Sequence, residues 1–214
     1  MKNIAFLLLF LSTLMACQEA PKPLLSNEQS EILYQTIMTR RSIRQFTEQQ
    51  IERSKLDTIL KAAIHAPSAN NKQPWEVRVI QNKALIEKIN QRYIDDSKRA
   101  NPDAVNPRWE QANFSVFYHA PTVLVFAGDK ENKYAQHDIG LMVENVLLMA
   151  HGMGLGTCTI GGVVKSLSDA KNADIYGLLK MPETHEVVVC VALGYPKEAP
   201  KVKERYAERI KIID

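Results

Sequence analysis

The chain has 214 residues, 45% of them hydrophobic and 24% charged, a balance typical of a globular protein with a buried core. Its net charge of +3 is too small to indicate nucleic-acid binding, so we expect no nucleic-acid partner. Three cysteines are too few for a disulfide-rich scaffold or a cysteine zinc cluster, and we expect no metal site. We expect Cys158 and Cys190 to be small core residues beside strands.

The first residues have the pattern of an export signal. Lys2 precedes an apolar run over residues 4–15 that is interrupted only by Ser12 and Thr13. This run is shorter than the roughly 20 residues that a membrane-spanning helix needs. A basic start, a short apolar stretch and a small residue before the cleavage point are typical of a secretory signal peptide. The alternatives are an uncleaved membrane anchor and a buried helix.

The four residues Leu14-Met15-Ala16-Cys17 resemble the lipobox of bacterial lipoproteins. The resemblance implies that residues 1–17 comprise the signal peptide and a lipidated Cys17, whose acyl chains anchor the protein to a membrane. Residues 18–25 contain two prolines and are expected to form a short extended tether. Residues 26–214 are then the folded domain. The sequence therefore predicts an exported lipoprotein of the bacterial cell envelope.

The folded part alternates between helical and strand patterns. Ser26 and Gln29 form a capping-box pattern at the start of the first expected helix. Apolar residues at helical spacing indicate a second helix, which Pro67 follows. The expected elements are helices over 28–39, 52–65, 83–99, 138–151 and 168–179, strands over 75–80, 122–127 and 187–193, and a polar loop over 100–113. This order predicts an α+β domain.

The expected helix over 138–151 is apolar on nearly every side, with Glu144 and Asn145 as its polar interruptions. Such a helix must be buried, either in a core or against another subunit. We therefore expect a homodimer interface there. Asp138 is expected to be an N-terminal cap or a first-turn charge.

Two polar stretches suggest ligand binding. In the first, Arg40-Arg41-Ser42-Ile43-Arg44, an extended chain would point residues 40, 42 and 44 to one side, which suits a phosphate group. The alternative is that basic residues simply favour a helix C-terminus. The second stretch, over 66–75, is either a plain turn or a set of amide groups suited to the edge of a heterocycle.

Two further stretches are less specific. The glycine-rich segment over 152–162 follows a helix, so it is not a dinucleotide fingerprint, and Gly152 is expected to be a helix C-cap. Gly161 and Gly162 lack side chains, which would let their backbone N–H groups approach a flat ligand. The basic segment over 201–205 is, on its own, best explained as a solvated tail.

Together the four stretches resemble the FMN-dependent nitroreductase family, over about residues 30 to 210. The matching motifs are Arg-Arg-Ser-Ile-Arg, Pro-Ser-Ala-Asn-Asn-Lys-Gln-Pro-Trp, Gly-Leu-Gly-Thr-Cys-Thr-Ile-Gly-Gly, and Gly-Tyr-Pro followed by two basic residues. The resemblance implies that the first motif and the basic tail grip the phosphate and ribityl chain of FMN. It also implies that the second and third motifs contact the flavin ring. The implied cofactor-binding residues are Arg40, Arg41, Ser42, Arg44, Pro67, Ser68, Asn71, Ile160, Gly161, Gly162, Lys203 and Arg205.

The resemblance also implies a fold and a reaction. The fold is a central mixed β-sheet flanked by helices, in an intertwined homodimer with FMN at the subunit interface. The reaction is a ping-pong reduction of nitroaromatics, quinones or similar small acceptors by NAD(P)H, through hydride transfer at flavin N5 and without a catalytic side chain. Thr159 departs from the family, which often has an aromatic residue or Pro there, and the stretch over 95–117 is variable.

An exported position conflicts with a nicotinamide donor, because NAD(P)H is largely cytoplasmic. The alternative is therefore an exported flavin-binding or redox-relay lipoprotein that does not turn over nicotinamide. A further alternative is a structural lipoprotein that has kept the fold and lost the cofactor.

Overall fold

A computed structural model describes residues 24–100, 109, 111, 113–168 and 170–213. The expected signal peptide, Cys17 and most of the tether lie outside the described residues, as does most of the expected loop over 100–113. Within the described ranges, no helix is both long enough and apolar enough to cross a membrane.

The described chain contains the predicted helices and strands together with two elements that were not predicted, β3 and α5. The helices are α1 (Asn27–Thr39), α2 (Arg53–Ala63), α3 (Lys83–Ala100), α4 (Ala135–Gly152), α5 (Val164–Ser168) and α6 (Ala173–Leu178). The strands are β1 (Trp75–Ile80), β2 (Thr122–Asp129), β3 (Gly156–Ile160) and β4 (His185–Gly194). Short 3₁₀ turns are η1 (Ala69–Asn71), η2 (Ala170–Asn172) and η3 (Ala207–Arg209).

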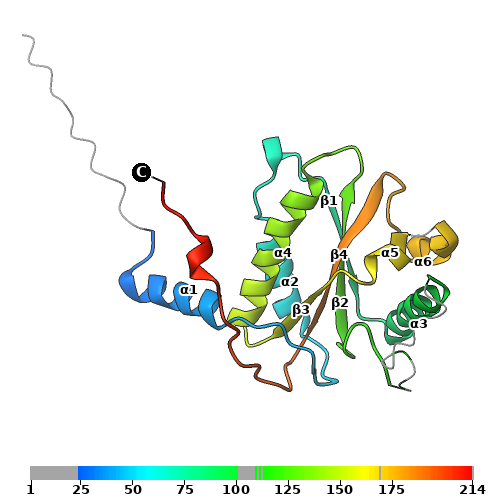
Figure 1. Ribbon diagram of the computed structural model, residues 1–214, viewed down its shortest axis with the longest axis horizontal. Coiled ribbons are helices and arrows are strands. Elements are labelled where there is room, and N and C mark those ends of the chain that lie inside the picture. Colours follow the sequence, from blue (N-terminus) through cyan, green and yellow to red (C-terminus); the bar gives the residue numbers. More distant parts are fainter. Residues whose placement is uncertain (1–23, 101–108, 110, 112, 169, 214) are drawn as a thin grey trace, which may run out of the picture.

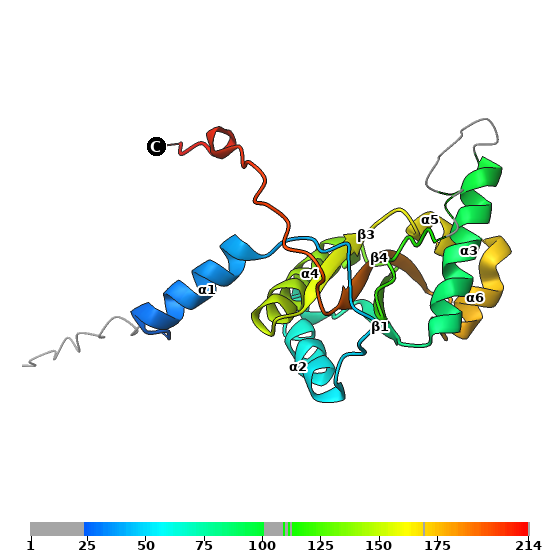
Figure 2. The same ribbon diagram turned by 90° about the horizontal axis from the view of Figure 1, so that it is seen from below.

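In the described part of the chain, these strands form a four-stranded sheet in the order β1-β2-β4-β3. All three pairs of strands are antiparallel, and a parallel bridge joins Ser42 to Thr157. Helices α2 and α4 cover one face of the sheet, and α3, α5 and α6 cover the other (Figures 1 and 2). The predicted α+β class, with a central sheet flanked by helices, is confirmed.

The core consists of two apolar clusters, one on each face of the sheet. Val123 and Val125 of β2 belong to the cluster under α3, α5 and α6, whereas Leu124 and Phe126 belong to the cluster under α2 and α4. All four side chains are fully buried. A strand covered on both faces needs apolar side chains on both, which explains the continuous apolar run that predicted β2. Cys158 and Cys190 are buried, as expected.

Two predictions about elements were wrong. Residues 156–160, in the glycine-rich segment for which no strand was expected, form β3, because they pair with β4 along their whole length. The helix expected over 168–179 is present only as α6, which follows the turn η2, and α5 before it was not expected. Asn172 precedes α6 with a non-helical φ of −106° and ψ of 22°, and its buried side chain bonds to Asp96 and Ser166. These bonds hold it out of a continuous helix.

Helix α1 lies apart from the helices that cover the sheet (Figures 1 and 2). The predicted capping box of Ser26 and Gln29 is present, yet no side chain of α1 is buried. In both views α1 extends away from the sheet and its covering helices (Figures 1 and 2). Its apolar side chains are therefore open to solvent, including Ile32 at 60% exposure.

Helix α4 is buried on one broad side only. Ile139, Met142 and Val146 face the core, whereas Leu141 is 39% exposed. The helix begins at Ala135 with Tyr134 as its cap residue, so Asp138 is a first-turn charge and not the cap.

Candidate functional site

The Arg40–Arg44 segment leaves the C-terminus of α1 and runs along the edge of the sheet beside β3. Ser42 forms the parallel bridge with Thr157, and the Ile43 N–H donates to the Thr157 carbonyl at 2.8 Å. The predicted extended conformation is thus present at its centre. Backbone pairing fixes the segment, so its side chains have a defined direction relative to β3.

The two consecutive arginines have different surroundings. The Arg41 guanidinium donates to the carbonyls of Met38 and Arg40 at 2.7 and 2.6 Å, as the helix-end alternative predicted. Its Nε is buried and has no hydrogen-bond partner within the described residues. The side chain of Arg40 is 23% exposed, and its Nε lies 4.0 Å from Oε1 of Glu144 on α4. Arg40 is therefore the freer of the two to bind an anion.

Arg44 is held from two sides. Its backbone N–H donates to the Glu198 carboxylate, and its guanidinium carbon lies 5.8 Å from the centre of the Tyr118 ring. A hydrogen bond with Tyr118 raises the pKa of Arg44, although burial opposes this effect. Arg44 therefore stays cationic. The sequence patterns gave no signal for Tyr118 or Glu198, because both come from distant parts of the chain.

The loop between α2 and β1 holds Pro67, Ser68 and Asn71. Asn70, Asn71 and Gln73 all have positive φ, at 52°, 53° and 47°. Such conformations are uncommon for residues other than glycine, and they concentrate at functional sites. The Ser68 hydroxyl accepts from the Gln73 N–H at 3.0 Å, and the Gln73 amide donates to Asn71 Oδ1 at 3.1 Å. The loop is thus built more elaborately than a plain turn requires.

Asp138 ties this loop to the start of α4. Its buried carboxylate accepts from the Ala69 N–H at 3.1 Å. The sequence predicts a role for Asp138 only within its own helix. Nothing in its spacing along the chain indicates the contact with Ala69 in the loop. The side chain of Pro67 is exposed, and that of Ser68 is half-buried.

The turn after β3 offers an open backbone surface. Ile160 is buried, whereas Gly161 and Gly162 are exposed. A Cβ built on Gly161 would meet no atom within 4 Å, and the φ of Gly161 lies outside the left-handed region. Neither packing nor backbone conformation within this chain requires glycine there. The open space above Gly161 would let a flat ligand approach the backbone, as the predicted flavin contact needs.

Lys203 and Arg205 lie on an exposed segment that leaves the body after β4, and Figure 2 shows it diverging from α1. The Arg205 guanidinium donates to the carbonyls of Lys203 and Glu204, both at 3.3 Å. None of the hydrogen bonds found for these two residues in the described chain reaches Arg40, Ser42 or Arg44.

Helix α4 separates the other two parts of the predicted site. At its C-terminal end, Nε2 of His151 lies 2.9 Å from the hydroxyl of Thr39, next to Arg40. Toward its N-terminal end, Asp138 holds the loop that carries Asn71. At 1.5 Å per residue these two contacts lie roughly 20 Å apart along the helix. In contrast, Ile160 lies only roughly 10 Å along β3 from the bridge at Ser42.

Cavities in the described part of the molecule include one at the Arg40–Arg44 segment and one at α3. A cavity of about 280 Å³ beside the Arg40–Arg44 segment is lined by Arg41, Ile43, His151 and Glu198, among others. A larger cavity of about 570 Å³ lies between the start of α3 and residues 113–121. None of the predicted cofactor-binding residues lines the larger cavity, so its size alone does not identify the site.

Comparisons with known proteins agree with the sequence motifs. The sequence profile of the Nitroreductase family matches residues 37–195. The chain is 31% identical over 189 residues to an NADPH-flavin oxidoreductase from Vibrio harveyi, covering 80% of this chain and 68% of the relative. It is 26% identical over 205 residues to an iodotyrosine deiodinase from Haliscomenobacter hydrossis, covering 87% and 88%. A crystal structure of a nitroreductase with bound FMN from Bacteroides fragilis superimposes with a TM-score of 0.78 and 29% identity, covering 85% of this chain and 98% of that one.

Proposed function

Because this chain belongs to the Nitroreductase family, we propose that it binds FMN and acts as an NAD(P)H-dependent oxidoreductase on small acceptors. The observation that carries the proposal is the open turn at Gly161, directly after the strand that pairs with the Arg40–Arg44 segment. The names of an FMN-bound structural neighbour and of the flavin oxidoreductase relative support the cofactor and the donor.

The donor groups in this chain suit the two ends of FMN. The guanidiniums of Arg40 and Arg44 and the hydroxyl of Ser42 are typical ligands of a phosphate. The backbone N–H groups of the turn over 160–162 would hold the edge of the ring, where negative charge develops on reduction. When bound, FMN supplies the electron transfer itself, taking a hydride from NAD(P)H and passing electrons to the acceptor. No side-chain acid or base is needed, so this chain binds, orients and stabilises charge.

The Gly161 backbone provides a direct test of cofactor binding. We expect Gly161→Ala to weaken FMN binding by about tenfold, or ~1.4 kcal/mol, because the new methyl group meets the ligand and not the protein. Gly177→Ala is the matched control, since a Cβ on Gly177 in α6 also meets nothing within 4 Å. Thermal unfolding of the FMN-free proteins should show no loss of stability in either variant. Equal FMN affinities in the two variants would place the flavin elsewhere.

The complete site requires a second copy of the chain, so we propose a homodimer. The contacts that hold the phosphate segment and the Asn71 loop lie at opposite ends of α4, roughly 20 Å apart along the helix, which favours a site shared by two chains. Two copies packed in opposite directions along α4 would bring the Asn71 loop of one chain to the Arg40 segment of the other. The exposed apolar faces of α1 and of α4 around Leu141 supply a surface for that contact.

The C-terminal segment fits the same arrangement. Val202, Ile210 and Ile213 are each more than two-thirds exposed, at 72%, 78% and 90%. In a dimer they would bury against the partner, and the same segment would carry Lys203 and Arg205 to a phosphate site. Isolated chains expose an apolar surface that a dimer would remove from water.

Mixing two inactive variants tests whether the site is shared. Arg40→Ala damages the phosphate end, and Asn71→Ala damages the ring end. If the site is composite, a mixed dimer holds one site with both substitutions and one intact site. We expect refolding an equal mixture to restore FMN binding to roughly one site in four, at wild-type affinity, if chains pair at random. Each variant refolded alone is the control. Absence of any restored high-affinity binding would mean that each chain builds its own site.

We further propose that Cys17 is lipidated and that the domain is held at the bacterial cell envelope, which rests on the lipobox resemblance. Two functions must then be distinguished at that location: an enzyme that takes electrons from NAD(P)H, and a flavin relay that does not turn over nicotinamide. Stopped-flow mixing of the FMN-loaded protein with NADH and NADPH separates them, because a relay would leave its flavin oxidised. The relatives include an iodotyrosine deiodinase as well as a flavin oxidoreductase, so the acceptor needs a steady-state screen.

A further inference from the structure

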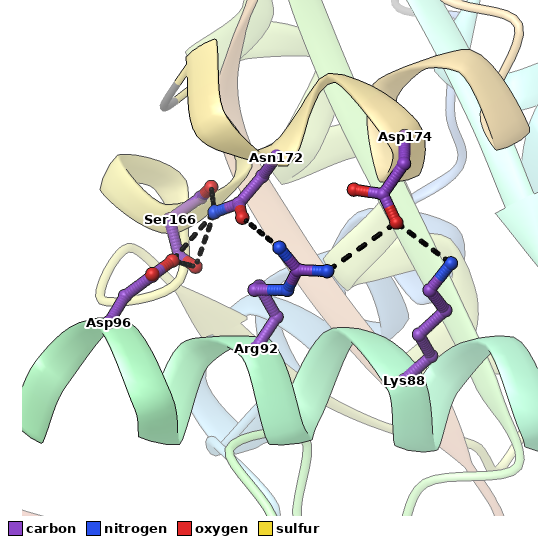
Figure 3. A network of polar contacts seen from close by, with 6 residues as sticks. All are labelled: Lys88, Arg92, Asp96, Ser166, Asn172 and Asp174. Atoms are coloured by element: carbon purple, nitrogen blue, oxygen red, sulfur yellow. Dashed lines mark hydrogen bonds and ion pairs between the residues drawn. The ribbon is translucent and has the colours of Figure 1, made fainter.

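A buried polar network joins α3 to the segment after β3 (Figure 3). Oδ2 of Asp96, on α3, accepts hydrogen bonds from the Ser166 hydroxyl and from the Asn172 amide, the latter at 2.6 Å. The same amide nitrogen donates to the Ser166 carbonyl at 2.7 Å. Ser166 and Asn172 are 7% and 1% exposed, so these bonds are shielded from competing water. A single carboxylate oxygen therefore fixes both α5 and the start of α6.

The network continues along one side of α3. Lys88, Arg92 and Asp96 are spaced four residues apart, so they share one face of the helix, as Figure 3 shows. Arg92 donates to Asn172 Oδ1 at 2.8 Å, and Lys88 Nζ lies 2.9 Å from Asp174 Oδ2. Side chains from three turns of α3 thus bind Ser166, Asn172 and Asp174, and they fix α5 and the start of α6 relative to α3.

This segment is continuous with the open glycine turn. The Val164 N–H at the start of α5 donates to the Gly161 carbonyl at 3.1 Å. The Tyr93 hydroxyl of α3 lies 3.7 Å from where a Cβ on Gly162 would be. The turn itself has no side chain at 161 or 162 with which to anchor its position. Its orientation therefore depends on α5, and that of α5 depends on α3.

Apolar packing alone already holds these elements together. Val163 and Leu167 are buried in the same cluster as Ile86 and Ile89 of α3. Such contacts are non-directional, whereas hydrogen bonds to a carboxylate fix an orientation. Burial raises the pKa of Asp96, but bonds from Ser166 and Asn172 outweigh it, so the carboxyl stays ionised at neutral pH. The network adds direction to a contact that the apolar cluster already stabilises.

We propose that Asp96 is a positioning residue, which acts through Ser166 and α5 to hold the backbone N–H groups of the turn over 160–162 in the orientation that faces FMN. This inference rests on the proposed function. Asp96 does not touch the flavin, and its effect is transmitted by the hydrogen bonds to Ser166 and Asn172.

Because Ser166 and Asn172 both donate to Oδ2 of Asp96, two substitutions of Asp96 in the full chain form a matched pair. In Asp96→Asn the carbonyl oxygen replaces Oδ2 and keeps both bonds, whereas Asp96→Leu keeps the volume and loses both. In FMN-free protein, we expect amide hydrogen exchange over 160–164 to be about tenfold faster in Asp96→Leu and close to wild type in Asp96→Asn. With FMN bound, we expect a more negative reduction potential in Asp96→Leu only, since looser N–H donors stabilise the reduced flavin less.

Three outcomes would overturn the proposal. The first is an amide exchange rate and a flavin reduction potential in Asp96→Leu that both equal those of the wild type. The second is an equal effect of Asp96→Asn and Asp96→Leu on these measurements, which would assign the role to the charge of Asp96. The third is an equal effect of Asp174→Asn, which disturbs the far end of the network. If Asp96→Leu does not fold, Ser166→Ala removes one donor at small volume cost and should reproduce the exchange result. Because the exchange measurement needs no cofactor, failure of FMN binding in the wild type would be recognised separately.

Discussion

Replacing Arg40 and Arg205 together by alanine is expected to weaken FMN binding by about a hundredfold or more. A hydrogen bond to a charged group contributes roughly 1.5–3 kcal/mol, and each tenfold in affinity corresponds to ~1.4 kcal/mol. Arg40 is the arginine whose guanidinium is not engaged with the end of α1, and Arg205 is open to solvent in the single chain. Titration of FMN into the FMN-free protein at fixed ionic strength measures the change.

The control for this pair is Arg53→Ala. Arg53 is 84% exposed and pairs with Asp57 within α2, so its loss removes one positive charge that is not among the predicted cofactor-binding residues. It should bind FMN like the wild type. The salt dependence of FMN affinity provides a second check. Added salt should weaken FMN binding less in the double variant than in the wild type, because fewer positive charges contact the phosphate. Unchanged FMN occupancy in the double variant would show that the phosphate is held elsewhere.

Gly156→Ala is expected to destabilise the folded protein by about 1–3 kcal/mol and to weaken FMN binding as well. A Cβ on Gly156 would lie 2.7 Å from Cγ1 and 2.9 Å from Cβ of Ile43, closer than real contacts allow. Ile43 is buried at the centre of the Arg40–Arg44 segment, so the clash must move either β3 or that segment. Chemical denaturation measures the loss of stability, and flavin titration measures the loss of affinity.

The source of that clash can be isolated with a double-mutant cycle. Ile43→Ala removes Cγ1 and Cγ2, two of the three atoms that the new methyl group would meet. The two substitutions together should therefore cost less than the sum of their separate effects. Strict additivity would mean that Gly156 matters for a reason other than its contact with Ile43.

Local patterns were sufficient for most elements of the fold. The apolar runs of β2 and β4 and the capping box of α1 are properties of short segments, and all three were predicted. Strand β3 was missed because its identity depends on pairing with β4 and with Ser42, both far away in the sequence. The interruption after α5 was missed for a similar reason, since the partner of Asn172 is Asp96 on α3.

The candidate site shows the same division. The residue types of the Arg40–Arg44 segment and of the turn at Gly161 indicated a phosphate and a flat ligand without knowledge of the fold. The network at Asp96 gave no sequence signal, because Asp96 is separated from its partners Ser166 and Asn172 by about seventy positions or more. The distance between Arg40 and Asn71 depends on the length and direction of α4. The homodimer that we propose rests on that distance.

The length of α4 has a consequence for assembly. If each FMN touches the phosphate segment of one chain and the Asn71 loop of the other, the ligand binds the dimer far better than the separated chains. Thermodynamic linkage then requires FMN to strengthen association by the same factor by which association strengthens FMN binding. Cofactor supply would thereby set how much of this protein is assembled, and loss of flavin would release chains whose α1 and C-terminal segment expose apolar side chains.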